Sequence, residues 1–398
     1  MINILFLGCV YSETQKDLFL KNSHRGYQFA AQNLQESLIA GFVENEANLN
    51  VLTIPALSTY PQGYQSPKVG DADYIFKGKK LGKSFGYLNL PLINHANRKK
   101  VAAYIDDWYA GTEGKRVIFV YALLEQQMSI AIEAKQRHPD VKLCVIVPDL
   151  PRFMGCNKYY KMLGLQDKAI CSINANLKQF DSLVVLAEPM VADLGMEEKP
   201  YTVVEGIYSG GFEKASEKYK EKVLLYTGGL YHRYGIDDLL EAFHRTSDSD
   251  LRLWLCGKGD AVSLIEEYQA KDERIVYKGT VAREEALAYQ RAATALVNPR
   301  HSNEVFTRFS FPSKTIEYMA SGTPCLMCHL ESIPQEYDEY LLYFDDETVD
   351  GMSRKISEVA GMSAGLLSSL GEKASEFVKN NKTAKCQVAK VIDFLEKN

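Results

Sequence analysis

The sequence lacks any long apolar run. None of its 398 residues lies in a stretch that approaches the roughly 18 consecutive apolar residues needed to cross a bilayer. The apolar beginning, MINILFLGCV, has no basic region before it and no small-residue cleavage site after it, so it predicts a buried first strand rather than a signal peptide. We expect a cytoplasmic protein with two domains of ordinary size.

Positive charge and paired cysteines are also scarce. The chain has 46 Lys and Arg against 51 Asp and Glu, and a net charge of −5 argues against a nucleic-acid partner. The eight cysteines are scattered, as is typical of reduced thiols in a cytoplasmic enzyme. Cys325 and Cys328 form a CxxC pair with no second pair nearby, which favours a buried strand over a zinc or redox site. We therefore expect no metal and no cofactor.

Short apolar runs alternate with helical patterns along the whole chain. Candidate strands lie at residues 2–7, 50–53, 116–121, 142–147, 182–187 and 201–204, and then at 222–226, 251–256, 275–278, 295–298, 324–327 and 342–344. Candidate helices lie at 26–42, 126–136, 236–244, 260–270, 283–292 and 351–358, with one or two more at 371–397. Apolar strands without polar alternation, separated by helices, indicate parallel sheets covered on both faces.

The two sets of strands are separated by a polar, glycine-containing stretch at residues 206–220. The sequence therefore predicts the α/β class, with two Rossmann-like doubly wound domains at 1–205 and 206–380. Ligands of such sheets bind at the carboxyl ends of the strands, so a central cleft between the two domains is the expected site.

The segment SFPSKTIEYMASGTP, residues 310–324, predicts a short helix. Ser310 suits the cap, Pro312 suits the first turn and Gly322 suits the end. Lys314 and Glu317 are three residues apart, so both project from one face. Backbone N–H groups and an ammonium would converge on phosphate, and the carboxylate would hold a pair of hydroxyls. This pairing indicates a nucleotide sugar; the alternative is an amphipathic helix with a solvated Lys and Glu.

Two loops of the same domain fit such a donor. Gly228 and Gly229 follow a strand and allow close backbone approach, and Arg233 is suited to a diphosphate. The turn Gly279–Val281 exposes backbone groups suited to the edge of a nucleobase. Each loop is also compatible with an ordinary turn.

In the first domain, Asp149 follows the strand at 142–147 and is suited to accept a proton from an acceptor hydroxyl or to orient it. An ordinary turn before proline is the alternative. His24, Arg25 and Gly26 lie in the long first loop, where a phosphate of the acceptor or donor could approach; a solvated histidine is the alternative there.

Residues 68–100 carry eight Lys or Arg and only two Asp, interleaved with aromatic residues. With Gly78, Gly82 and Gly86 in it, we expect a mobile loop. Such a loop would contact an anionic membrane or a lipid pyrophosphate, and the alternative is a solvated loop.

The order of these motifs resembles the GT-B glycosyltransferases, in particular the retaining glycosyltransferase family four, over nearly the whole chain. The resemblance is carried by YTGGLYHRYGIDDLLEAF, LRLWLCGKGD, RIVYKGTVAREEALAYQRAATALVNP and FSFPSKTIEYMASGTPCL. It implies a donor site in the second domain, an acceptor site in the first, and a last helix, residues 381–398, that packs back on the first domain. It implies a donor-binding set of Gly228, Gly229, Arg233, Gly279, Thr280, Val281, Ser313, Lys314 and Glu317.

The sequence departs from the family pattern in two places. The family often has a second glutamate eight residues before the position of Glu317, and here Phe309 occupies it. The basic residues that follow the family's glycine loop fall on Gly229 and Tyr234, with Arg233 adjacent as a substitute.

We therefore expect a hexosyltransferase-type glycosyltransferase that is active in polysaccharide assembly and peripheral to the inner face of a membrane. It would move a sugar from a nucleotide diphosphate, with UDP as the expected nucleotide, to a saccharide or lipid-linked saccharide. Asp149, Lys314 and Arg233 are the expected catalytic residues. The rivals are a non-hydrolysing nucleotide-sugar epimerase and a non-catalytic nucleotide-sugar-binding subunit.

Overall fold

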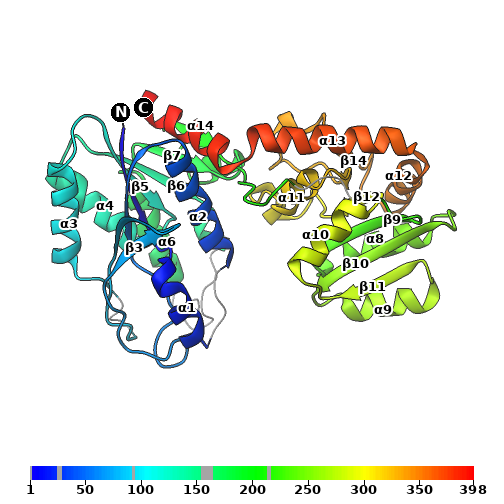
Figure 1. Cartoon of the computed structure of the whole chain (residues 1–398), viewed down its shortest axis with the longest axis horizontal. Helices are drawn as coiled ribbons and strands as arrows, with labels where there is room; N and C mark the ends of the chain where they lie inside the picture. The colour runs from blue at the N-terminus through cyan, green and yellow to red at the C-terminus, as the bar shows by residue number, and fades with distance from the viewer. Residues whose placement is uncertain (1, 25–28, 92–94, 154–164, 213–216) are drawn as a thin grey trace. The chain divides into compact units, whose positions relative to one another are not determined.

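The computed structural model describes residues 2–24, 29–91, 95–153, 165–212 and 217–398 (Figure 1). The chain divides into two compact units. Unit 1 comprises Met1–Ile207 and Ala384–Asn398, and unit 2 comprises Tyr208–Thr383. Each unit has its own hydrophobic core. The stretch at 206–220 that separates the two sets of strands in the sequence contains the first of the two points where the chain passes from one unit to the other.

Unit 1 is built on an eight-stranded sheet with the order β3-β4-β2-β1-β5-β6-β7-β8. Every neighbouring pair is parallel except β3 and β4, which are antiparallel. The strands are β1 (Asn3–Gly8), β2 (Asn48–Thr53), β3 (Ala72–Phe76), β4 (Lys79–Ser84), β5 (Arg116–Tyr121), β6 (Lys142–Val147), β7 (Ser182–Val185) and β8 (Tyr201–Val203). The helices are α1 (Glu13–Asn22), α2 (Phe29–Glu44), α3 (Arg98–Ala110), α4 (Glu125–Arg137), α6 (Leu165–Leu177), α7 (Pro189–Asp193) and α14 (Ala384–Lys397).

Unit 2 is built on a six-stranded parallel sheet with the order β11-β10-β9-β12-β13-β14. The strands are β9 (Lys222–Gly229), β10 (Leu251–Lys258), β11 (Ile275–Gly279), β12 (Ala295–Asn298), β13 (Cys325–Met327) and β14 (Leu342–Tyr343). The helices are α8 (Ile236–His244), α9 (Val262–Lys271), α10 (Arg283–Ala292), α11 (Lys314–Ala320), α12 (Val349–Gly361) and α13 (Ala364–Asn381). Helix α8 packs against α9 and α12, whereas α11 packs against α13.

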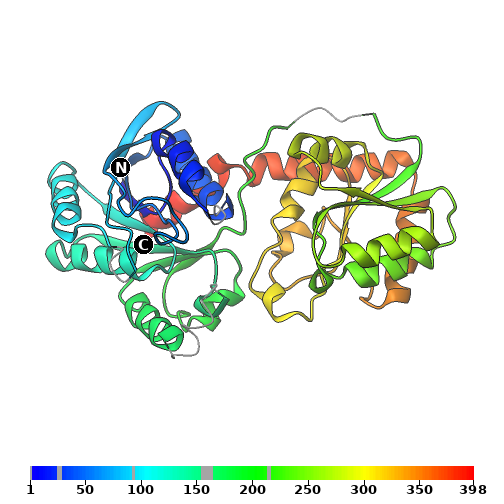
Figure 2. The same cartoon turned by 90° about the horizontal axis from the view of Figure 1, so that it is seen from below.

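The central strands explain why these segments form parallel sheets. All six residues of β1 are buried, as are the last five of β5 and of β6. Successive side chains of a strand point to opposite faces of the sheet, so a strand that is buried at every position must be covered on both faces. Helices cover the sheet of each unit (Figures 1 and 2). The predicted fold class, two Rossmann-like α/β domains, is confirmed.

The expectation of a mobile loop at residues 68–100 is wrong for the part that the structure describes. Strands β3 and β4 form an antiparallel hairpin at the edge of the sheet, with the turn at Lys77 and Gly78. Tyr74, Phe85 and Tyr87 are buried, so these aromatic residues pack into unit 1 and do not face a membrane. Lys77, Lys79 and Lys80 remain exposed, and exposed lysines are common on edge strands.

The last helix, α14, belongs to unit 1 and packs against α2. Its buried residues Val388, Val391 and Leu395 join the core that contains Leu38 and Phe42 of α2. Asn45, just after α2, donates from Nδ2 to the backbone oxygen of Lys385 at 2.8 Å. Among the described residues, no helix is both long enough and apolar enough to cross a membrane.

Candidate active site

Helix α11 begins later than the sequence predicts. It starts at Lys314, and Ser313 occupies the cap position with helical dihedral angles and no side-chain capping bond. Ser310 and Pro312 therefore lie outside the helix, because Phe309 and Phe311 are both buried and hold this segment in the core. The predicted end is confirmed, since Gly322 directly follows the last turn with φ of 76°.

Lys314 and Glu317 lie together on one face of α11, as the spacing predicts. The Lys314 ammonium is 2.7 Å from Glu317 Oε1, and Gln290 Nε2 of α10 donates to the same oxygen at 2.9 Å. The Glu317 side chain is 19% exposed and that of Lys314 is 43% exposed. The alternative of a solvated pair therefore fails for Glu317, whose carboxylate is largely enclosed and held by two donors, whereas Lys314 stays partly exposed.

Glu317 is held in its ionised form. Burial raises the pKa of its carboxyl group, but the charge of Lys314, the hydrogen bonds from Lys314 and Gln290, and the nearby charge of Arg283 together hold the pKa below its ordinary value. An enclosed carboxylate that stays ionised is a strong acceptor for hydroxyl groups.

A buried polar network ties this carboxylate to the glycine loop. Gln290 Nε2 also donates to Thr227 Oγ1 at 2.8 Å. The Tyr318 hydroxyl accepts from the Thr227 backbone N–H at 2.8 Å and lies 2.9 Å from the Thr227 backbone oxygen. Sequence reasoning missed Thr227, Gln290 and Tyr318, although Tyr318 is the neighbour of Glu317. The network fixes α10 and α11 against the end of β9.

The two glycines of the loop form the last two residues of β9. They pair with β10, where Gly257 lies opposite Gly228. Gly257 has φ of 143°, and a Cβ there would lie 1.8 Å from the backbone oxygen of Gly228. Only glycine fits at position 257, and its absence of a side chain lets the ends of β9 and β10 lie close together.

Arg233 follows in the loop and is exposed. Its guanidinium lies over the rings of Tyr231 and Tyr234, at 5.4 Å and 5.1 Å from the two centroids. Arg300, which follows β12, lies over the same Tyr234 ring at 4.1 Å. Sequence reasoning missed Arg300, although its position two residues after a predicted strand could have indicated a residue at the carboxyl end of the sheet. Tyr234 thus holds two guanidinium groups beside the glycine loop.

The turn Gly279–Val281 lies at the end of β11, the strand next to β10. Gly279 has φ of 71°, Thr280 Oγ1 is 3.4 Å from the backbone oxygen of Gly257, and Val281 is half-buried. Lys314, Glu317, the loop at Gly228 and Gly229, and this turn all belong to unit 2 and lie at or beside the carboxyl ends of its strands.

The predicted residues of unit 1 have different surroundings. Asp149 is exposed after β6, although desolvation by the surrounding protein raises the pKa of its carboxyl group. His24 is exposed, and its backbone N–H donates to the Gly63 oxygen at 3.0 Å. Arg25 and Gly26 lie outside the described residues. Phe309 of unit 2, at the position of the family's second glutamate, is 7% exposed.

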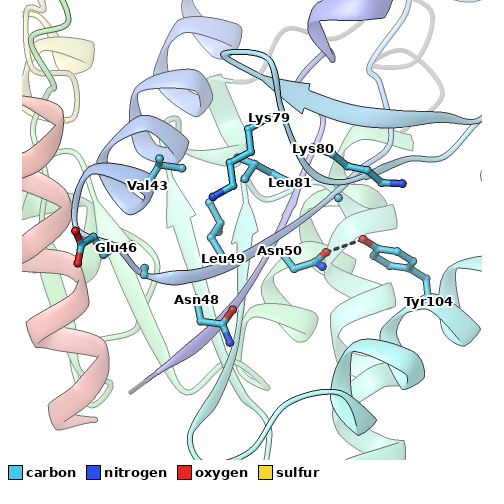
Figure 3. Close-up of a pocket in the computed structure, with 11 residues that line it drawn as sticks. Val43, Glu46, Asn48, Leu49, Asn50, Lys79, Lys80, Leu81 and Tyr104 are labelled. Carbon is cyan, nitrogen blue, oxygen red and sulfur yellow. Dashed lines mark hydrogen bonds between the residues drawn. The ribbon is translucent and has the colours of Figure 1, made fainter.

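A cavity of about 630 Å³ lies in unit 1 (Figure 3). It is lined by the first residues of β2 and β4, including Asn48 and Lys79, and by Tyr104, whose hydroxyl bonds Asn50 Oδ1 at 2.6 Å. β2 and β4 are parallel, so the cavity lies at the amino ends of these strands. Active sites of such sheets lie at the opposite edge.

Comparisons with known proteins agree with this geometry. Residues 221–361 match the family described as glycosyl transferases group 1. No curated protein matches the sequence. The fold is similar to that of a sucrose-phosphate synthase from Thermosynechococcus elongatus, with 15% identity, a TM-score of 0.62, and coverage of 99% of this chain and 98% of that one.

Two further structures have the same fold. The lipopolysaccharide outer core galactosyltransferase WaaB in its apo form has 14% identity and a TM-score of 0.60 over 100% of this chain and 99% of that one. A trehalose-6-phosphate structure from E. coli bound with UDP-2-fluoro glucose has 11% identity and a TM-score of 0.61, with the same coverage. Unit 2 thus carries a glycosyltransferase group 1 domain within a GT-B fold, and at this level the predicted enzyme class, a glycosyltransferase, is confirmed.

Proposed function

We propose that the protein is a retaining glycosyltransferase of the family-four type. It moves a sugar from a nucleotide diphosphate, with UDP as the expected nucleotide, to a saccharide or lipid-linked saccharide. The observation that carries this proposal is the enclosed, ionised Glu317 with Lys314 at 2.7 Å and Gln290 at 2.9 Å, beside the carboxyl end of β9.

Glu317 binds the two hydroxyls of the nucleotide's ribose. In the free protein one of its oxygens is already engaged by Lys314 and Gln290. A diphosphate competes for the half-exposed ammonium of Lys314, because two negative charges attract it more strongly than one carboxylate does. Donor binding would then redirect Lys314 to the phosphates and leave Glu317, still held by Gln290, to accept the hydroxyls.

The cations beside the glycine loop stabilise the leaving group. As the bond from the anomeric carbon to the diphosphate oxygen breaks, charge develops on that oxygen. Lys314 and Arg233, with the backbone of Gly228 and Gly229, would stabilise it, and the stacked Arg300 supplies a further guanidinium. The turn at Gly279, Thr280 and Val281 takes the base, and Ser313 completes the donor-binding set. These groups are the chain's own, so the proposal includes no metal and no cofactor for this step.

The acceptor is assigned to unit 1. The acceptor's hydroxyl oxygen forms the new bond to the anomeric carbon as the bond to the diphosphate breaks. The hydroxyl proton is taken up by Asp149, or by the departing diphosphate and then by solvent. The raised pKa of Asp149 suits a group that takes up a proton. His24, Arg25 and Gly26 remain the proposed acceptor loop.

Calorimetric titration with UDP, GDP and ADP, and then with their sugars, tests the donor half of the proposal. We expect one nucleoside diphosphate to bind clearly, and Glu317→Gln to weaken it by about 10- to 100-fold, through the loss of charge-assisted hydrogen bonds of about 1.5–3 kcal/mol. Glu273→Gln, at an exposed carboxylate of the same unit, is the matched control and should bind as the wild type does. Equal affinity for all variants would refute the role of Glu317.

The buried Phe309 favours one rival, a subunit that binds a nucleotide sugar without transferring it. The measurement that separates the two is NMR of a donor incubated with and without saccharide acceptors. Transfer or slow hydrolysis supports the enzyme, binding with neither supports the rival, and an isomer formed from the donor alone would indicate the epimerase.

We also propose that the enzyme works in the cytoplasm, at the inner face of a membrane, through the basic surface of residues 68–100. The exposed lysines Lys77, Lys79 and Lys80 lie on or beside the β3–β4 hairpin. Flotation with vesicles that contain anionic lipid should recover the protein at low salt and lose it at high salt. Replacing the three lysines by glutamine should abolish flotation; retention would show that this surface is not the contact.

A further inference from the structure

Three neighbouring strands of unit 2 bring three different ligand types to one place. β12, β13 and β14 are adjacent and parallel, so their carboxyl ends meet at one edge of the sheet. His301 follows β12, Cys328 directly follows β13 and Glu347 follows β14. The nitrogen, sulfur and oxygen that these side chains offer all lie within 4.8 Å of one another.

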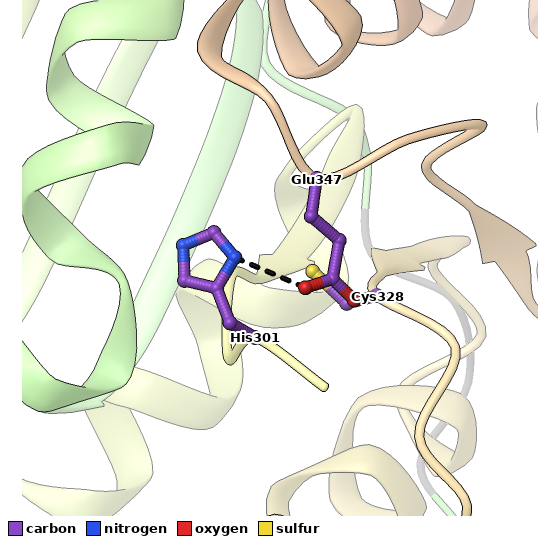
Figure 4. A group of neighbouring side chains, drawn as sticks. All are labelled: His301, Cys328 and Glu347. Carbon is purple, nitrogen blue, oxygen red and sulfur yellow. Dashed lines mark hydrogen bonds and ion pairs between the residues drawn. The ribbon is translucent and has the colours of Figure 1, made fainter. Parts of the chain in front are cut away.

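The three side chains point toward one another (Figure 4). His301 Nδ1 is 3.2 Å from Glu347 Oε2, and the Cys328 sulfur lies beside the same carboxylate. Cys328 is fully buried, and the side chains of His301 and Glu347 are 15% and 27% exposed. The group is therefore enclosed on the thiol side and open to solvent on the other, so an ion has a route to enter.

A fourth residue supports the histidine from behind. His301 Nε2 lies 2.8 Å from Asp238 Oδ2 of α8, which is an ion-pair distance although outside hydrogen-bond geometry. Metal-binding histidines usually give their second ring nitrogen to a carboxylate, which orients the ring and leaves the first nitrogen for the ion. Gly235 makes room for the same segment, because a Cβ there would lie 2.1 Å from the Pro299 oxygen and 3.2 Å from the His301 ring.

We propose that His301 Nδ1, Cys328 Sγ and a Glu347 oxygen form a transition-metal site of the zinc class. Zinc takes N, S and carboxylate O ligands at about 2.0–2.3 Å, which places ligands of one tetrahedral ion about 3.4–3.6 Å apart. The His301–Glu347 pair, at 3.2 Å, is already close to that separation, and the Cys328 sulfur lies within 4.8 Å of both ligand atoms. Cys328 binds as the thiolate, and its proton passes to solvent.

The competing explanation is an ion pair of protonated His301 with Asp238 and Glu347. That arrangement makes no use of the thiol, so the role of Cys328 distinguishes the two. A bound ion would fix the start of the segment between β12 and α11, which carries Arg300. The proposal does not depend on sugar transfer, since metal binding can be measured without any substrate.

The experiment uses the full chain, purified without a polyhistidine tag and stripped with a chelator. Cobalt(II) is titrated into it, and thiolate-to-cobalt charge-transfer absorption is followed in the near ultraviolet, with zinc as the competitor. We expect one cobalt per chain, displacement by zinc, and a thermal midpoint that rises with zinc. Cys328→Ser should abolish the thiolate absorption and lower affinity at least 10-fold. Cys325→Ser, at the buried cysteine on the other side of the CxxC spacing, should keep both.

His301→Asn and Glu347→Gln test the remaining ligands and should each weaken binding. Absence of thiolate absorption in the wild type at an excess of cobalt overturns the proposal and supports the ion pair. Absorption that persists in Cys328→Ser also overturns it, because cobalt then sits on another thiol such as the exposed Cys171. Far-ultraviolet circular dichroism of each variant shows whether a loss of binding reflects unfolding.

Discussion

Lys314 is the residue on which donor chemistry depends most directly. It sits at the first position of a helix, where the helix dipole already provides partial positive charge, so its ammonium is unfavourable unless an anion is near. In the free protein that anion is Glu317. A lysine at the positive end of a helix does not stabilise the helix, so we infer that its role is to bind an anionic ligand.

We expect Lys314→Ala to reduce transfer by about 10²-fold, as for the loss of one preorganised donor at a developing charge. The reduction should fall mainly on kcat, because the ammonium acts on charge that grows as the bond breaks. Steady-state kinetics with the purified enzyme measure it. Lys379→Ala, at an exposed lysine of α13, is the control. Unchanged turnover in the Lys314 variant would remove it from the mechanism.

The surroundings of Asp272 lead to a separate prediction about how the stability of the fold depends on pH. Hydrogen bonds from Arg274 hold the pKa of Asp272 well below its ordinary value of 3.8, against burial, and His244 adds to the effect. Arg274 donates from Nη2 at 2.7 Å and from Nε at 2.9 Å. A lowered pKa stabilises the fold above the unfolded-state value, and the contribution is lost as the pH falls toward the folded-state value.

Asp272→Asn should therefore lower the free energy of unfolding by about 2 kcal/mol at neutral pH. The deficit should shrink as the pH falls below about 4, where the unfolded wild type takes up the proton first. Urea unfolding at a series of pH values measures both. A deficit that stays constant with pH would mean that the ion pair is not its cause. Asp250→Asn, at an exposed carboxylate nearby, should change little.

At the scale of elements, the glycine loop is a joint between two strands. Its geometry depends on Gly257 of β10, which lies directly against the backbone of Gly228. We expect Gly257→Ala to push β9 and β10 apart at their ends, to lower stability by about 1–3 kcal/mol and to weaken nucleotide binding.

Thermal unfolding and calorimetry measure the two effects of Gly257→Ala. Gly361→Ala, where a Cβ meets nothing within 4 Å, is the matched control. If Gly257→Ala binds nucleotide with wild-type affinity, the loop does not need its present geometry.

The elements predicted best are those whose signal is local. The strands at 116–121, 142–147 and 295–298 and the helices at 236–244 and 283–292 have the predicted bounds, because each is an apolar or amphipathic run between clear breaks. The β3–β4 hairpin was missed because β4 is rich in lysine and its burial does not alternate along the strand. Helix α3 was missed because basic residues open it.

The parts of the candidate site that come from one short segment could be predicted from the sequence. The parts in which distant segments meet could not. Lys314 and Glu317 are three residues apart, so helical geometry alone joins them. Thr227 and Tyr318 are 91 residues apart, and nothing in their local sequence indicates that they share hydrogen bonds. The start of α11 was mispredicted because capping preference at Ser310 yields to the burial of Phe309 and Phe311.

At the scale of the whole molecule, unit 1 depends on the end of the chain. Val388, Val391 and Leu395 of α14 are buried in its core, each contributing about 1.5–3 kcal/mol of burial before the cost of ordering. We expect removal of residues 384–398 to lower the melting temperature of unit 1 and to leave that of unit 2 in place, so that calorimetry shows two transitions. Removing only the exposed residues 397–398 is the control. A single, unshifted transition would contradict the role of α14.

The same connection makes unit 2 an insertion within unit 1. The chain leaves unit 1 at Ile207 and re-enters it at Ala384. Next to these points, Gln387 Nε2 donates to the Gly206 oxygen at 2.9 Å, and Tyr208 N–H donates to the Lys382 oxygen at 2.8 Å. Entry and exit are therefore adjacent, as in a guest domain placed in a host loop. Because unit 2 is one continuous segment, a gene could exchange it for another domain in a single step. Unit 1 consists of two segments, so it can be produced alone only if these are joined by a short linker.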